Sequence, residues 1–162
     1  MKILSRIWEL KFSKLWRLAW IGVKNPFLVM PTNQATLHTM QICDRIYGHT
    51  HHGDNKANAF RHALWNILIA KRVLKIVKTD EKALQWSDKI TTLHETLMPN
   101  PPLEMEMDLH NNMMGRKLYL ELQDASEEKI IEFLKVKLEE AVQIKTVEET
   151  ENLKDFLVFI EE

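Results

Sequence analysis

Apolar residues recur at intervals of three and four along most of the chain, which is the spacing of one face of an α-helix. Pro26, Gly48 and the proline-rich stretch 98–102 each end a helical segment, because proline and glycine interrupt helical geometry. The pattern predicts helices over residues 1–23, 32–47, 55–78, 80–97, 103–123 and 126–144. The stretch 153–160 is predicted as a further helix, although residues 156–160 could equally form a short buried strand.

The helix predicted over residues 55–78 is apolar on nearly every side between Ala57 and Val77. Apolar residues all round a helix are typical of a central position among other helices. The chain holds only four glycines and five prolines, fewer than an all-β fold spends on its turns. The sequence therefore predicts an all-α fold, a compact bundle of about six or seven helices around this buried helix, in a single domain over residues 1–162.

Charge is distributed unevenly, although the formal net charge is only −1. Residues 1–24 hold six basic side chains and one acid, together with Trp8, Trp16 and Trp20, whereas the chain from Glu121 onward holds thirteen acids and five lysines. The first segment is therefore predicted to be a basic amphipathic helix, and we expect contact with a membrane surface through residues 1–24. No nucleic-acid partner is expected, because the rest of the chain offers no second basic stripe.

Basic residues also interrupt the apolar residues of this first segment, so it lacks the continuous apolar region of a cleavable signal peptide. The chain contains no run of about 18 uncharged apolar residues, the length that a membrane-spanning helix needs. The expected location is the cytoplasm or the periphery of a membrane. The single cysteine, Cys43, cannot form an internal disulfide and is expected to be a small buried side chain.

A row of polar residues lies on the otherwise apolar central helix. Asn58, His62 and Asn66 follow one another at intervals of four, which places them on one face. Trp65 lies beside the row and Arg61 at its edge. A buried polar group without a partner costs roughly 1–3 kcal/mol, so this row requires a cavity or a second polar surface opposite it.

A second polar row occurs on the helix predicted over residues 103–123. It occupies one face at intervals of three, four and seven and consists of Asp108, Asn111, Asn112 and Gly115. Asn, Asp and Gly are poor helix formers that together cost about 2 kcal/mol relative to alanine, so a compensating function or contact is expected. Gly115 also allows another backbone or a ligand to come close.

Histidine and carboxylate side chains supply the candidate chemistry. His94 and Glu95 lie near the end of one predicted helix, where an imidazole beside a carboxylate can transfer protons or share a metal. With members of the two rows, they give the candidate catalytic residues His62, His94, Glu95 and Asp108. The candidate substrate-binding residues are Asn58, Arg61, Trp65, Asn66, Asn111, Asn112 and Arg116. A divalent metal is compatible with these side chains, and zinc, magnesium and no metal remain alternatives.

The stretch between the second and third predicted helices contains four further polar residues, His49, His51, His52 and Asp54. Histidines can bind zinc, but structural zinc sites usually hold ligands at a fixed helical or knuckle spacing that this stretch lacks. We therefore expect solvated loop residues here. The sequence contains no Gly-rich phosphate loop, no Cys-x-x-Cys pair and no Gly-x-Ser-x-Gly elbow. Their absence excludes the commonest classes of kinase-like, zinc-ribbon and serine-hydrolase proteins.

Three sequence blocks follow one another within residues 57–116: Asn58-Ala-Phe-Arg61-His62-Ala-x-Trp65-Asn66, then His94-Glu95, then Asp108-Leu-His-Asn111-Asn112-x-x-Gly115-Arg116. Together they resemble an uncharacterised bacterial helical domain, which occurs alone and at the C-terminal ends of large secreted proteins of the polymorphic-toxin kind. The resemblance implies a functional site at these motif positions and suggests a hydrolytic, toxin-like activity.

Two functions are compatible with the polar rows. The first is a hydrolase acting on a polar or anionic, lipid-linked substrate, with Glu95 or Asp108 as base or metal ligand and a histidine as acid or ligand. The second is a non-enzymatic helical interaction module, in which the rows form a structural network. Side chains converging on an open cleft would favour the enzyme, and a closed network with every group paired would favour the module.

Overall fold

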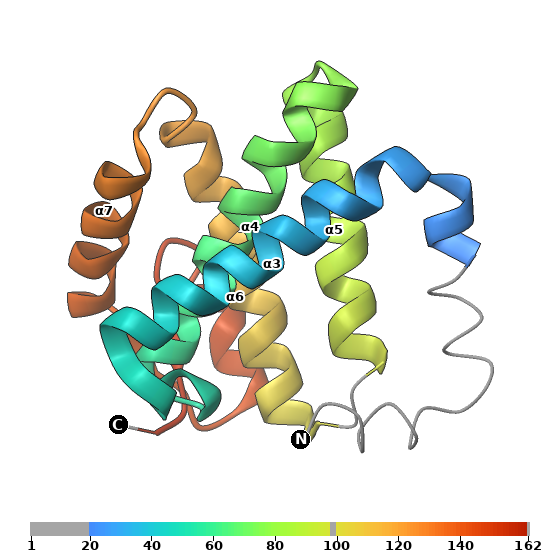
Figure 1. Ribbon diagram of the computed structural model, residues 1–162. Helices are drawn as coiled ribbons and strands as arrows, with labels where there is room; N and C mark the ends of the chain where they lie inside the picture. The colour runs from blue at the N-terminus through green and yellow to red at the C-terminus, as the bar shows by residue number, and fades with distance from the viewer. Residues whose placement is uncertain (1–19, 98–99, 162) are drawn as a thin grey trace.

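The computed structural model describes residues 20–97 and 100–161. Its elements in chain order are α3 (Pro26–Tyr47), the 3₁₀ helix η1 (Gly48–His52), α4 (Lys56–Val77), α5 (Asp80–Leu97), α6 (Pro102–Glu121), α7 (Glu127–Glu139), the strand β1 (Val142–Gln143), the 3₁₀ helix η2 (Val147–Asn152) and the strand β2 (Val158–Phe159). The predicted all-α fold is confirmed (Figure 1). Most of the predicted basic amphipathic segment lies outside the described residues. In residues 20–97 and 100–161, no helix is both long and apolar enough to cross a membrane.

The helix α4 occupies the centre because its sequence offers an apolar surface in nearly every direction. The helices α3, α5, α6 and α7 all contact it, and its side chains Leu64 and Ile67 are fully buried. Asn55 caps its first turn by accepting hydrogen bonds from two backbone N–H groups. The helix ends at Val77, and the C-cap residue Lys78 adopts the left-handed conformation with φ 67°. The central helix predicted over 55–78 is therefore confirmed.

The helix α3 begins earlier than the sequence pattern indicates, at Pro26 rather than at residue 32. Pro31 lies inside it and removes the hydrogen bond that an N–H at this position would make to the carbonyl of Phe27. Phe27 is 79% exposed, so water can solvate that carbonyl and the helix continues. Thr32 is consequently helical, and its hydroxyl accepts a 2.8 Å hydrogen bond from the indole N–H of Trp86, which ties α3 to α5.

The C-terminal segment also differs from the prediction. The helix α7 ends at Glu139 rather than near residue 144, and the helix predicted over 153–160 is wrong, since β2 pairs there in parallel with β1. Asn111 of α6 donates from its side-chain amide to the carbonyl of Val158 at 2.8 Å and accepts from the N–H of Val158 at 3.0 Å. Both backbone groups of Val158 are therefore engaged by a side chain, which favours extended backbone over helix.

Gly115 sets the separation between α6 and α4. A Cβ atom at this position would lie 2.5 Å from the carbonyl oxygen of Ala63 and 2.7 Å from the Cα atom of Ala63. Both are backbone atoms of the central helix, so they cannot move aside without displacing that helix. Of the two close approaches predicted at Gly115, by another backbone or by a ligand, the structure shows the approach of a backbone.

We expect Gly115→Ala to lower the free energy of unfolding by about 3 kcal/mol, because overpacking usually costs about 1–3 kcal/mol and here the obstructing atoms are backbone. Thermal unfolding followed by circular dichroism measures the change. The matched control is Gly22→Ala, whose added Cβ would meet only Val29, at an ordinary 3.7 Å. The control should melt at or above the wild-type temperature. A Gly115→Ala protein of wild-type stability would contradict the close contact.

Candidate functional site

Three helices each contribute one ionisable side chain to a common point. His62 comes from α4, Glu95 from α5 and Asp108 from α6, and one nitrogen or oxygen atom of each lies within 4.8 Å of those of the other two. All three side chains are buried, with Glu95 only 1% exposed. These residues, called the buried cluster below, are three of the four predicted catalytic residues.

The contacts of His62 define its tautomer. Its Nε2 lies 2.8 Å from Nη2 of Arg61, and a guanidinium only donates hydrogen bonds, so Nε2 is the acceptor and Nδ1 carries the proton. Nδ1 in turn donates to the side-chain oxygen of Asn112 at 3.1 Å. Burial lowers the pKa of His62 well below its usual value, and the charge of Arg61 lowers it further. The imidazole is therefore neutral at neutral pH.

The two carboxyl groups of the buried cluster have different partners. Glu95 accepts a 2.9 Å hydrogen bond from the side-chain amide of Asn112. Asp108 places Oδ1 3.2 Å from Nε2 of His62, and this oxygen has no hydrogen-bond partner among the described residues. The one lone pair of Nε2 already accepts from Arg61, so Oδ1 and Nε2 repel each other while Asp108 is ionised. A proton on Asp108, or a cation in place of the guanidinium, relieves this repulsion.

Burial raises the pKa of both carboxyl groups, to about 7 for Glu95 and to about 8 for Asp108, where the negative charge of Glu95 contributes as well. Arg61 supplies one positive charge beside them. One carboxylate compensates that charge, and the other group stays protonated because a further buried negative charge would be unpaired. At neutral pH the pair thus holds one proton beside a neutral imidazole, which is an arrangement suited to acid–base chemistry.

A hydrogen-bond network centred on Asn66 supports the buried cluster. Asn66 donates to the side-chain oxygen of Asn112 at 2.7 Å. The side-chain oxygen of Asn66 accepts hydrogen bonds from Ser87, Thr91 and Arg116. Ser87 and Thr91 were not among the predicted site residues. They precede Glu95 by eight and four residues, and this spacing, which puts all three on one face of α5, is the signal that could have found them.

Three other predicted site residues form contacts outside the buried cluster. The indole N–H of Trp65 donates to the hydroxyl of Thr36 in α3 at 2.8 Å. The side-chain amide of Asn58 donates to the carbonyl of Gly53 at 2.6 Å, which fastens the start of α4 to the preceding loop. His94 is exposed, and its ring lies edge-on to that of Trp65 with 5.3 Å between the ring centroids. The Trp65 and His94 rings therefore lie on the side of the site that leads to the surface.

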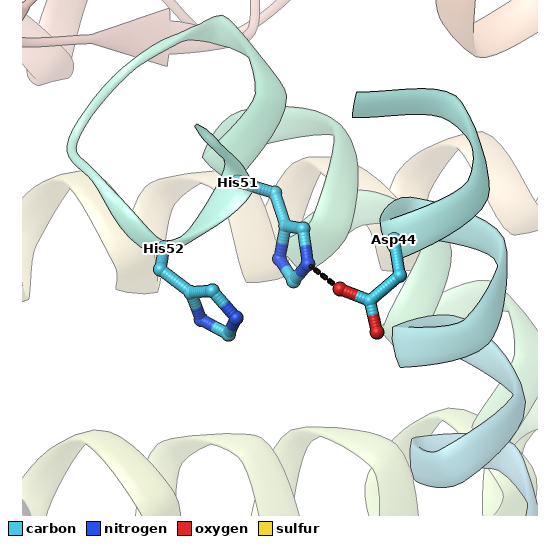
Figure 2. Close-up of side chains that lie close together, drawn as sticks. All are labelled: Asp44, His51 and His52. Carbon is cyan, nitrogen blue, oxygen red and sulfur yellow. Dashed lines mark hydrogen bonds and ion pairs between the residues drawn. The ribbon is translucent and has the colours of Figure 1, made fainter. Parts of the chain in front are cut away.

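The histidine-containing stretch was expected to be a solvated loop, and this expectation is wrong for His51. Residues 48–52 form η1, and His51 is fully buried, with its Nε2 2.9 Å from Oδ1 of Asp44 (Figure 2). The short helix contacts both α3 and α4, so it removes one imidazole from water. His49 and His52 are exposed as expected.

The chain belongs to a family described as a domain of unknown function (DUF6973), which matches residues 19–142. The matched range contains every helix from α3 to α7 and therefore the whole buried cluster. No curated protein and no solved structure matches the chain. The resemblance to an uncharacterised helical domain family agrees with this membership.

We expect the raised carboxyl pKa values to make the wild-type protein less stable as the pH rises. In an unfolded chain these groups have pKa values of about 4, so between about pH 4 and pH 8 the folded protein holds protons that the unfolded chain has released. Their contribution to stability is complete below about pH 4 and is lost as the pH rises through 7 and 8. The slope is roughly 1.4 kcal/mol per pH unit for each such proton.

Urea unfolding at a series of pH values from about 6.5 to about 9 measures this slope, because below about pH 6.5 the lowered pKa values of His62 and His94 give an opposing slope. Asp108→Asn replaces the carboxyl group with an amide that does not ionise, so it should flatten the decline. Asp124→Asn, which changes an exposed carboxyl group, should keep the wild-type slope. Equal slopes for the wild type and Asp108→Asn would contradict the raised pKa of Asp108.

Proposed function

We propose that this chain is a hydrolase whose acid–base chemistry takes place at the buried cluster. The observation that carries the proposal is the 3.2 Å contact between Oδ1 of Asp108 and Nε2 of His62, because Oδ1 is buried without a hydrogen-bond partner among the described residues. A network that served only the fold would gain about 1–3 kcal/mol by pairing this acceptor. Titratable groups with strongly perturbed pKa values are typical of functional sites.

The carboxyl pair can divide the two proton transfers of a hydrolysis between its members. The carboxylate takes one proton from a water molecule as the water oxygen attacks the substrate. The protonated carboxyl group gives its proton to the leaving oxygen as the bond to that oxygen breaks. The pair then again holds one proton. Arg61 stabilises negative charge that develops on the attacked group, and His62 positions Asp108.

The half-buried guanidinium of Arg61 favours an anionic substrate. Its charge lies beside buried groups, where water screens it less than at an open surface. Trp65 and His94 extend the site toward the surface and offer ring faces to a larger substrate. We infer that the substrate is an anionic ester, with the scissile bond at the buried cluster and the remainder of the molecule toward His94.

A membrane lipid or lipid-linked precursor is the form of such a substrate that the sequence favours. Residues 1–24 are basic and are predicted to form an amphipathic helix. Farther along, the exposed apolar side chains of Val23, Phe27 and Met30 continue this character onto α3. Hydrolysis of a membrane component also suits the toxin-like activity that the motif resemblance suggests.

A divalent metal ion can assist this chemistry. The buried cluster offers one imidazole and two carboxylates within 4.8 Å of one another, which is a ligand set that divalent cations accept. Arg61 lies on the Nε2 side of His62, so a cation would bind there only with the guanidinium turned away. Such an ion would displace the shared proton, and its binding would therefore strengthen as the pH rises.

A non-enzymatic interaction module is the second candidate function, and two observations favour it: all three side chains of the buried cluster are buried, and a hydrogen-bond network surrounds Asn66. The side-chain oxygen and nitrogen of Asn66 are both engaged, by Ser87 and Thr91 on one side and by Asn112 on the other. Satisfied buried networks of this kind fix the register of packed helices. In this alternative the buried cluster would only complete the network, with the proton on Asp108 shared with Glu95.

Hydrolysis assays on the full chain separate the two functions. We propose a panel of a carboxylic ester, a phosphomonoester, a phosphodiester and a phospholipid in vesicles, each with chelator, Mg²⁺ or Zn²⁺. The wild type should hydrolyse at least one of these. Asp108→Asn and Glu95→Gln should each lower kcat by about 100-fold or more, since a general acid or base contributes typically 10²–10⁴-fold. The control Asp124→Asn should keep wild-type activity. Folded variants of wild-type activity, or a wild type inactive on the whole panel, would favour the module.

Co-sedimentation with vesicles tests the membrane part of the proposal. The full chain should bind vesicles containing anionic lipid and bind neutral vesicles weakly, because anionic lipid attracts basic residues near a membrane by about 1 kcal/mol each. The double variant Lys11→Glu/Lys14→Glu should reduce binding. Lys82→Glu/Lys129→Glu makes the same charge change at exposed positions of α5 and α7 and should bind like the wild type. Equal, weak binding of the wild type to both kinds of vesicle would remove the membrane surface from the proposal.

A further inference from the structure

A second group of ionisable side chains lies outside the buried cluster, where α3 meets η1. Asp44 belongs to the last turn of α3, and His51 and His52 belong to η1. Figure 2 shows the three side chains converging, with the His52 ring directed toward the other two. One nitrogen or oxygen atom of each lies within 4.8 Å of those of the other two. These three residues are called the junction site below.

His51 has one ring nitrogen that the fold does not use. Its Nε2 lies 2.9 Å from Oδ1 of Asp44, which fixes the proton on Nε2 and leaves a lone pair on Nδ1. The side chain is fully buried, and Nδ1 has no hydrogen-bond partner among the described residues. In Figure 2 this nitrogen lies on the side of the ring that faces His52. A buried acceptor without a partner is costly. Nδ1 of His51 is therefore an unused ligand atom directed into the junction site.

We propose that the junction site binds a divalent transition metal ion of the zinc class, with Nδ1 of His51 and a ring nitrogen of His52 as ligands. Asp44 lies on the Nε2 side of the His51 ring, opposite Nδ1, so it orients the imidazole through the Nε2–H without contacting the ion. A carboxylate that orients a ligating histidine in this way is a frequent feature of zinc sites. The remaining coordination positions face solvent, because His52 is exposed.

The ligand chemistry selects the class of ion. Two imidazole ligands suit Zn²⁺, Ni²⁺, Co²⁺ or Cu²⁺, whereas Mg²⁺ and Ca²⁺ prefer oxygen ligands.

The junction site and the buried cluster are separate but share one neighbour, Arg61. Its Nη1 donates to the backbone carbonyl of His51, and its Nη2 donates to Nε2 of His62. A metal ion that held η1 in place would therefore also hold the guanidinium against the buried cluster. The experiment must distinguish an ion at the junction site from one at the buried cluster.

Isothermal titration of the metal-free full chain with Zn²⁺ tests the proposal, and Co²⁺ absorption reports the ligands. His52→Ala and Asp44→Asn are the decisive variants, because both residues are exposed and their replacement removes little packing. Each should weaken Zn²⁺ binding by at least about tenfold. Zn²⁺ should also raise the melting temperature of the wild type but not that of His52→Ala.

His49→Ala is the matched control, since it removes an exposed imidazole from the same short helix and should leave the affinity for Zn²⁺ unchanged. Glu95→Gln alters the buried cluster and should likewise keep the junction ion. Wild-type affinity in both His52→Ala and Asp44→Asn, or no Zn²⁺ binding by the wild type, would overturn the proposal. An ion lost in Glu95→Gln but retained in His52→Ala would also overturn it and would instead place the metal at the buried cluster.

Discussion

The close approach of α6 to α4 at Gly115 is the constraint on which the rest of the structure depends. A glycine at this position lets α6 rest directly on the backbone of Ala63. Asp108 and Asn112 lie seven and three residues before it on α6, so the same approach brings them within reach of His62. With any side chain at residue 115, the polar faces of the two helices would be held apart and both would lose their partners.

Once the two polar faces meet, burial decides the charge of what lies between them. Two carboxyl groups and one guanidinium cannot all be charged in this enclosed space without one unpaired negative charge. Burial therefore raises the pKa values of Glu95 and Asp108, and burial together with the charge of Arg61 lowers the pKa of His62. The proton retained by the carboxyl pair supplies the acid, and the ionised member supplies the base, that the proposed hydrolysis requires.

Arg61 connects the buried cluster to η1. It is half-buried and lies between the interior and η1, where it donates hydrogen bonds to His62 and to the backbone carbonyl of His51. Among the described residues, its guanidinium is the only positive charge at the buried cluster. The fold thus places the carboxyl pair on the interior side of the Arg61 guanidinium. Asn66 and Asn112, which are bonded to each other, hold the imidazole and Glu95 from the opposite side.

The sequence by itself determined the central helix, the two polar rows and the close contact at Gly115, because helical periodicity and residue chemistry are local properties. It also indicated Glu95 as a residue of the site. It did not indicate Ser87 or Thr91, whose hydroxyl groups reach Asn66 only after α5 has packed against α4. Only the tertiary structure decided that Val158 forms a strand, since the bonds that Asn111 makes to it join residues 47 positions apart. The burial of His51 was likewise undetermined, because it follows from how η1 packs between α3 and α4 and not from the spacing of the histidines.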